Sequence, residues 1–118
     1  MGCCLKQVSK ENFPTKVIYA QDGREFKPGD IVQHFKRVPD GKDEFPGTDM
    51  YRYKILCIAV DTDSMQDLVI YQSMYGEKII WARSAKEFCD GVCKEIYPNC
   101  GQDYRFIRIQ DGTESDNK

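Results

Sequence analysis

The sequence is poor in the residues from which many catalytic and metal sites are built. It contains one histidine, His34, so any site that needs two imidazoles is excluded. It has no Cys-x-x-Cys pair, no glycine-rich phosphate loop and no nucleophile-elbow motif. Because no convincing acid–base or nucleophile pair remains, the sequence does not favour an enzyme, and we expect neither a cofactor nor a metal.

Long apolar runs and an excess of positive charge are also missing. The chain has 17 Lys and Arg against 19 Asp and Glu, a formal net charge of −2. Duplex nucleic acid is therefore not an expected partner, since its binders usually carry a basic footprint. No apolar run approaches the roughly 18 residues that cross a bilayer, and no signal-peptide core is present. We expect a cytoplasmic protein with no membrane partner. Gly2 and Cys3 are typical of an acylated N-terminus, but Lys6 stands where the myristoylation pattern has Ser or Thr.

Six cysteines are present, and reduced thiols are the favoured interpretation because disulfides belong to exported chains. Cys57 lies within an apolar strand pattern, which predicts a small and buried core residue. An alternative for the C-terminal part is a zinc site built from Cys89, Cys93, Cys100 and a fourth ligand.

Segments rich in β-forming residues, separated by turn residues, dominate the chain. We expect strands over residues 16–21, 31–36, 51–61, 68–71, 78–83 and 104–109. The second half of the segment 51–61 is apolar on both faces, which predicts a doubly buried central strand. Ser84 and Glu87 form a capping box that begins one short helix. The pattern predicts a mainly β fold, either a small barrel or a strongly curved antiparallel sheet with one short helix.

The domain organisation expected from these segments is a single domain over residues 1–118. It comprises an N-terminal extension over 1–15, a β core over 16–109 and a polar tail over 110–118 that we expect to be disordered. Residues 37–50 interrupt the core with two prolines, two glycines and four acids. A loop of this length is typically functional or mobile, and Phe45 among acids is typical of a protein contact.

Several short stretches occur in a characteristic order along the chain. They are His34-Phe35-Lys36, Tyr53-Lys54-Ile55-Leu56, Leu68-Val69-Ile70-Tyr71, Met74-Tyr75-Gly76, Trp81-Ala82-Arg83 and Phe88. This order, over about residues 28–90, resembles the domain of unknown function 1653 family, which is mainly bacterial and from phages. The resemblance implies a small SH3-like β-barrel and brings no established activity. The loop 37–50 stands as an insertion in this pattern, and Tyr104-Arg105-Phe106 echoes the C-terminal end of the family.

The candidate site combines aromatic rings with a guanidinium. Trp81 and Arg83 are two residues apart on one strand and therefore share a face. An indole beside a guanidinium, with phenols nearby, can stack a flat ligand and hold an anion. The predicted ligand-binding residues are His34, Tyr53, Tyr71, Tyr75, Trp81 and Arg83. We expect them to bind a small anionic, nucleotide-like ligand or a polypeptide.

Alternatives remain open for each part of this candidate site. The aromatic residues can instead be core, with Arg83 exposed at the end of its strand. His34 can lie on a sheet face, bonded to a neighbouring strand, and strand alternation predicts its ring on the face opposite that of Phe35. A separate alternative for the function is a protein–protein interaction through the loop 37–50, with no small-molecule ligand.

Overall fold

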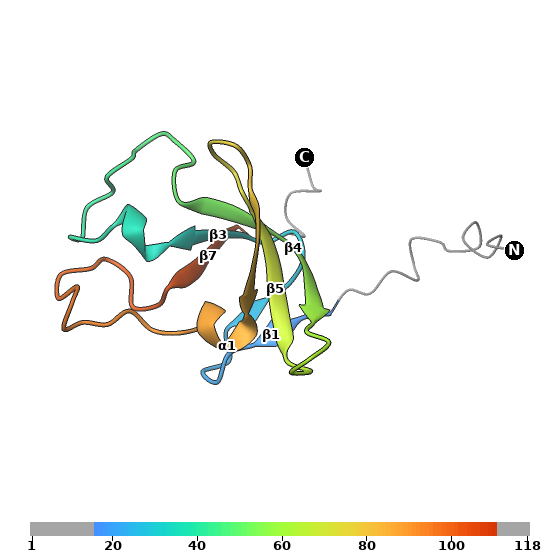
Figure 1. Ribbon diagram of the computed structural model, residues 1–118. Coiled ribbons are helices and arrows are strands. Elements are labelled where there is room, and N and C mark those ends of the chain that lie inside the picture. Colours follow the sequence, from blue (N-terminus) through green and yellow to red (C-terminus); the bar gives the residue numbers. More distant parts are fainter. Residues whose placement is uncertain (1–15, 111–118) are drawn as a thin grey trace, which may run out of the picture.

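The computed structural model describes residues 16–110, and this part of the chain is mainly β, as predicted (Figure 1). Its strands are β1 (Ile18–Tyr19), β2 (Glu25–Phe26), β3 (Ile31–His34), β4 (Arg52–Val60), β5 (Asp67–Ser73), β6 (Ile80–Ser84) and β7 (Phe106–Gln110). The helices are the 3-10 turn η3 (Phe35–Arg37) and the α-helix α1 (Ala85–Phe88). The predicted N-terminal extension lies outside the described residues, as do Gly2 and Cys3. Of the tail predicted over 110–118, only Gln110 is described, and it is the last residue of β7.

Two antiparallel sheets make up the fold. The strand order is β6-β5-β4-β3-β7 in the larger sheet, and β1 pairs with β2 in the smaller one. The last strand returns beside the first of the larger sheet, because β3 pairs with both β4 and β7. Within residues 16–110, β6 and β7 are the two edges and are not bonded to each other. Strand pairing therefore leaves the sheet open and does not close a barrel.

The larger sheet is strongly curved. Tyr71 of β5 and Phe106 of β7 have ring centroids 5.4 Å apart, although β4 and β3 lie between these strands. In a flat sheet, strands three positions apart would be separated by roughly 14 Å. Phe88 of α1 fills the space between, stacked on Phe106 with a centroid distance of 4.2 Å. The concave side of the sheet thus holds the core.

The short helix α1 begins as the sequence predicts. The Ser84 hydroxyl caps it by accepting a hydrogen bond from the Glu87 backbone N–H over 3.1 Å. The helix ends at Phe88, whose side chain is fully buried in the core. Four helical residues are enough here because the stabilisation comes from packing rather than from helix propensity.

A β-bulge in β4 overturns two expectations for this strand. The register with β5 shifts between Ile55 and Cys57. Ile55 and Ile58 are both buried, whereas Cys57 is exposed. The prediction of a buried Cys57 is therefore wrong, because the extra residue of a bulge reverses the alternation of faces. The predicted double burial of the second half is also wrong, since Val60 at its end is 44% exposed.

The end of β3 differs from the predicted strand. The chain leaves the strand after His34, which caps η3. As a result, the rings of His34 and Phe35 stack with centroids 4.6 Å apart and planes at 29°. The expectation that these rings lie on opposite faces is wrong, because alternation holds only while the backbone stays extended.

Candidate binding face

The six predicted binding residues lie together on the concave face of the larger sheet. Tyr71 and Trp81 are directly paired between β5 and β6, and paired residues project from the same face. Arg83 follows two residues after Trp81 and shares that face. His34 is paired with Phe106, whose ring it contacts at 5.0 Å.

Two further tyrosines continue this face toward β4. Tyr53 contacts the ring of Tyr71 with a centroid distance of 5.4 Å and that of Phe106 with 5.7 Å. Tyr75 follows β5 and contacts Tyr53 with a centroid distance of 5.7 Å. We call the set of His34, Tyr53, Tyr71, Tyr75, Trp81 and Arg83 the aromatic face.

The members of the aromatic face differ in how far solvent reaches them. Tyr53 and Tyr71 are 8% and 5% exposed and belong to the core. Trp81 is 45% exposed, and a third of the Arg83 side chain is accessible. His34 is partly buried. The two buried tyrosines therefore form the floor, and the other side chains are the ones that a ligand can touch.

Hydrogen bonds fix the side chains of the aromatic face. The Tyr53 and Tyr75 hydroxyls are bonded to each other at 2.7 Å. The Trp81 indole Nε1 donates to the Ser73 hydroxyl over 3.0 Å. Burial, together with the bond from Tyr75, raises the pKa of Tyr53 far above its usual value, so this phenol stays protonated. The rings are thus held in place before any ligand arrives.

His34 is an uncharged donor on this face. Its Nδ1 accepts a hydrogen bond from the Lys36 backbone N–H over 3.1 Å, which assigns the ring proton to Nε2. Burial lowers the pKa of His34 to about 4, and the charges of Lys36, Arg105 and Arg83 add to this effect. The charges of three cations therefore act on a neutral imidazole whose free nitrogen, Nε2, can only donate. Such a setting favours an acceptor or an anion.

One glutamate partly neutralises the cations beside His34. The Glu87 carboxylate is 3.4 Å from Nη1 of Arg83. The backbone oxygen of Glu87 accepts a hydrogen bond from Nε of Arg105 over 3.0 Å. The Glu87 carboxylate is more than half exposed, so its pairing with Arg83 is weak and can be exchanged for another anion.

Tyr51 is a residue of this region that the sequence did not single out. Its backbone φ is +62°, a left-handed conformation that bulky residues rarely adopt and that often marks functional sites. Its ring lies 6.1 Å from His34, 6.0 Å from Tyr75 and 5.7 Å from Phe45 by centroids. No local sequence signal predicts this conformation.

Arg105 is a second residue of this region that was not predicted as a site residue. Its only signal in the sequence was the similarity of Tyr104-Arg105-Phe106 to the family pattern.

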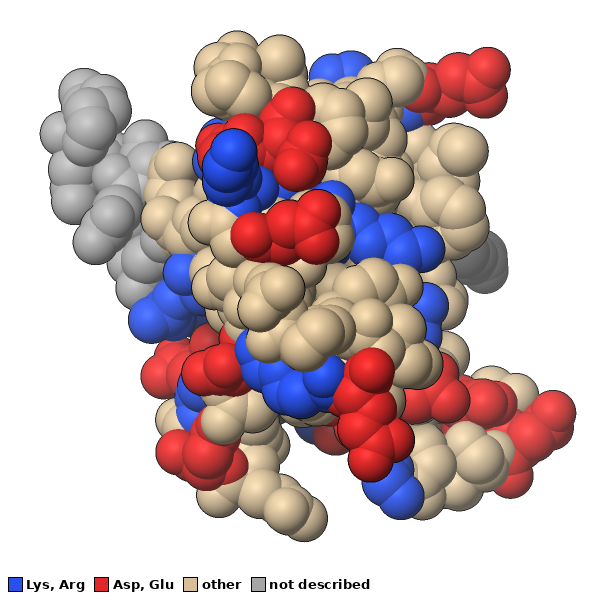
Figure 2. Space-filling view, turned by 90° about the vertical axis from the view of Figure 1, so that its left-hand side faces the viewer, with Lys and Arg blue, Asp and Glu red and all other residues tan. Residues whose placement is uncertain are grey.

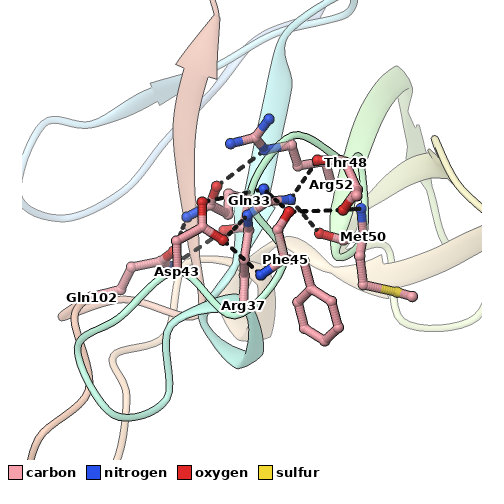
Figure 3. A network of polar contacts seen from close by, with 8 residues as sticks. All are labelled: Gln33, Arg37, Asp43, Phe45, Thr48, Met50, Arg52 and Gln102. Atoms are coloured by element: carbon pink, nitrogen blue, oxygen red, sulfur yellow. Dashed lines mark hydrogen bonds and ion pairs between the residues drawn. The ribbon is translucent and has the colours of Figure 1, made fainter.

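The loop 37–50 is folded around the buried Arg37 (Figure 3). Its guanidinium donates to both carboxylate oxygens of Asp43 over 3.0 and 3.3 Å. It also donates to the backbone oxygens of Thr48, Met50 and Phe45 over 2.8, 2.9 and 2.6 Å. All five N–H groups of the guanidinium are thereby used. The loop 37–50 is consequently an ordered structure, and it reaches the aromatic face through the contact of Phe45 with Tyr51.

A second polar network links the strands to the segment after α1 (Figure 3). Gln33 donates to the Gln102 side-chain oxygen over 2.9 Å, and Arg52 donates to that of Gln33 over 3.1 Å. Gln102 in turn donates to the backbone oxygen of Tyr104 over 3.0 Å. These bonds position the segment that carries Arg105.

Charge on the outer surface is mixed. Figure 2 views the molecule from the side of loop 37–50, and Lys and Arg there are interleaved with Asp and Glu. No single broad basic area dominates this view, in keeping with the net charge of −2.

A cavity that was not predicted lies elsewhere in the described part of the chain. A cavity of about 520 Å³ separates the β1–β2 hairpin from the end of α1, and none of the six predicted residues lines it. The Arg24 guanidinium stacks over the Tyr104 ring in its wall, 3.6 Å from the centroid. Arg24 also donates to the Asp22 carboxylate over 2.8 Å and to the Cys89 backbone oxygen over 2.9 Å. Nε and Nη2 of Arg24 are therefore paired within this wall, whereas its Nη1 is buried without a hydrogen-bond partner among the described residues.

The cysteines of the described residues belong to no metal-binding cluster. Within residues 16–110, no group of three or more His, Cys, Asp or Glu side chains is placed to hold a metal ion. Cys89, Cys93 and Cys100 are free thiols. The described residues therefore give no support to the zinc site considered from the spacing of these cysteines.

Comparisons with known proteins identify a family but no characterised relative. The model of the family described as "Protein of unknown function (DUF1653)" matches residues 30–108. Neither the curated proteins nor the solved structures contain a match. No helix within the described part of the chain is long and apolar enough to cross a membrane.

Proposed function

Since the chain belongs to the DUF1653 family of proteins of unknown function, we propose its role from its own side chains: it binds a small anionic, nucleotide-like ligand on the aromatic face. His34, Trp81 and Arg83 make the contacts, with Tyr75 beside them. Tyr53 and Tyr71 support these side chains from below. The protein acts as a binding module rather than as an enzyme.

The observation that carries this proposal is that Arg83 and Arg105 both contact Glu87, on the face that also holds an uncharged histidine. Lys36, Arg83 and Arg105 all lie close enough to His34 to lower its pKa. The Arg83 guanidinium and the Nε2–H of His34 are hydrogen-bond donors that cannot accept. A phosphate or carboxylate supplies the acceptors that match them.

The aromatic part of the site sets the shape of the ligand. Trp81 is 45% exposed, and its ring is held by the bond to Ser73. A planar ring such as a nucleobase stacks on an exposed indole, with a contribution of about 1–3 kcal/mol. An anion on the same ligand then reaches Arg83, replacing the exposed carboxylate of Glu87. A planar anion can both stack on Trp81 and pair with Arg83. An inorganic ion lacks the ring for the first contact, and a neutral ring lacks the charge for the second.

A titration with matched variants tests this function. Nucleotides and dinucleotides are added to the full chain while Trp81 fluorescence and backbone amide shifts are followed. Arg83→Gln should weaken binding about tenfold or more, the loss expected when one charge-assisted contact is removed. Lys54→Gln, which removes an equal charge from the exposed outer face of β4, should leave the affinity unchanged.

Two results would count against the proposal. The first is the absence of shifts at His34, Tyr75, Trp81 and Arg83 with every ligand of the panel. The second is an equal loss of affinity in Arg83→Gln and Lys54→Gln, which would show a general charge effect.

A protein–protein interaction through the loop 37–50 is the second candidate. It is favoured by the order that Arg37 gives the loop and by the contact between Phe45 and Tyr51. An ordered loop costs less entropy on binding than a free one. Phe45→Ala and deletion of residues 39–48 should both remove partners from a pull-down, whereas Lys42→Ala should not. An unchanged set of partners in both altered chains would exclude this function.

The proposal also includes the finer fold and setting. We infer an SH3-like barrel in which side-chain packing completes what strand pairing leaves open. The support is the contact of Tyr71 with Phe106 across the concave side. A single domain, a cytoplasmic location and a bacterial or phage origin stay predictions from the sequence.

A further inference from the structure

Strand β6 presents an unprotected edge. Within residues 16–110 it pairs only with β5, so its outer side has no strand beside it. Ile80 is 58% exposed there, and Ala82 is exposed as well. Natural edge strands are usually blunted by lysine, proline or a bulge. Strand β6 contains no lysine and no proline, and Arg83 is its one charged residue.

The backbone groups that face outward follow from the register with β5. The Ser73 N–H donates to the Ile79 backbone oxygen over 2.9 Å, so Ile79 is bonded toward β5. Bonded and outward-facing residues alternate along an antiparallel strand. Ile80 and Ala82 therefore direct their N–H and C=O groups toward the open edge.

We propose that β6 pairs with β6 of a second copy of this chain, antiparallel and centred on Ala82. Each Ala82 then exchanges both backbone hydrogen bonds with its counterpart, and Ile80 is bonded opposite the partner's Ser84. The two larger sheets become one continuous sheet across a twofold axis. The exposed Ile80 side chains are shielded from water along the joint.

Self-complementarity is what selects a second copy rather than an unrelated peptide. In an antiparallel pair centred on Ala82, Trp81 of one copy lies directly opposite the partner's Arg83. This pair falls at a position without backbone hydrogen bonds, where Cα atoms are about 4.5 Å apart and side chains are closest. An indole and a guanidinium attract each other at this range. The small Ala82 at the centre leaves room for the two strands to approach.

The inference does not depend on the proposed ligand. Pairing through β6 is a property of the ligand-free chain, whereas the proposed function concerns the affinity for an anion. If both hold, the partner's Arg83 adds a second guanidinium beside each Trp81. Oligomeric state and ligand affinity are measured separately, so failure of one is distinguishable from failure of the other.

A charge-swap experiment at Ala82 tests the pairing. Sedimentation of the full chain, from low concentration up to about 200 µM, should show a monomer–dimer equilibrium with a micromolar Kd. Ala82→Lys and Ala82→Asp each place like charges opposite one another and should yield monomers. Mixing the two variants should restore a dimer, because opposite charges then face each other. Met65→Lys, a change at another exposed apolar side chain in the β4–β5 turn, should behave as the wild type.

A second measurement keeps the test independent of the variants. The outward amide of Ala82 should exchange with solvent slowly in concentrated wild-type protein and rapidly in dilute protein. A wild-type chain that stays monomeric at the highest concentration overturns the proposal. So does a dimer that persists unchanged in both Ala82→Lys and Ala82→Asp.

Discussion

The rings of Phe88 and Phe106 lie almost parallel, with planes at 7° and centroids 4.2 Å apart. One ring comes from the four-residue helix α1 and the other from the edge strand β7. Both are almost fully buried, and both also contact Tyr71 of β5. This stacked pair joins α1 to β7, which share no backbone ladder, and it fills the space on the concave side of the larger sheet.

Truncating this pair should strongly destabilise the fold. Phe88→Ala should lower the free energy of unfolding by about 3–5 kcal/mol, because a large buried ring leaves a cavity. Phe88→Leu keeps more of the volume and should cost clearly less. Urea unfolding followed by circular dichroism measures both changes. A loss below about 1 kcal/mol for Phe88→Ala would contradict a central packing role.

Arg37 should tolerate no replacement, including lysine. Arg37→Lys keeps the charge but cannot reproduce the five donors that reach Asp43, Phe45, Thr48 and Met50. Carbonyl groups left without donors predict a loss of about 2–4 kcal/mol in urea unfolding. Lys42→Ala, on the exposed part of the same loop, should stay within about 0.5 kcal/mol of the wild type. Equal stability of the two variants would refute the role assigned to Arg37.

His34 should make the protein less stable in acid. Its pKa falls from 6.5 to about 4 on folding, so the unfolded chain binds a proton first as the pH is lowered. The contribution of neutral His34 to the free energy of unfolding is therefore complete above pH 6.5. It is lost as the pH falls toward 4. We expect this loss to be at most about 2–3 kcal/mol, because the ring is partly hydrated.

The variant His34→Gln isolates this contribution from those of the carboxylates. Unfolding measured between pH 7 and pH 4 should show a shallower decline in the variant than in the wild type. Parallel curves would mean that His34 does not titrate differently in the folded and unfolded chains.

The thiols of Cys57 and Cys89 should differ in reactivity, because the bulge in β4 leaves Cys57 exposed. Cys57 is exposed, whereas Cys89 is half-buried and burial raises its pKa. Brief treatment with iodoacetamide at neutral pH should therefore modify Cys57 well before Cys89, since the thiolate is the reacting form. Peptide mass spectrometry reads out each site. Faster labelling of Cys89 would contradict the bulged register.

Much of the fold was predictable because it depends on interactions between residues that are close in the sequence. Asp22-Gly23 marks the β1–β2 turn, and alternating residues mark the first half of β4. The capping box at Ser84 places α1. These signals depend on neighbours within a few residues, and they also sufficed to put Trp81 and Arg83 on one face.

The remainder depends on contacts between distant parts of the chain. The bulge before Cys57 and the positive φ of Tyr51 are imposed by packing and have no local marker. The approach of Arg105 to His34 requires β7 to return beside β3. For the same reason, the sequence did not show that Arg37 organises its own loop.

That loop resembles a stretch of chain closed by a cross-link. In the folded chain, Arg37 joins its own position to residues 43–50 through hydrogen bonds and so holds this loop closed. The closure uses a guanidinium and carbonyl groups rather than sulfur. The order of the loop is therefore independent of the redox state of the surroundings, and a chain with its thiols fully reduced should retain it.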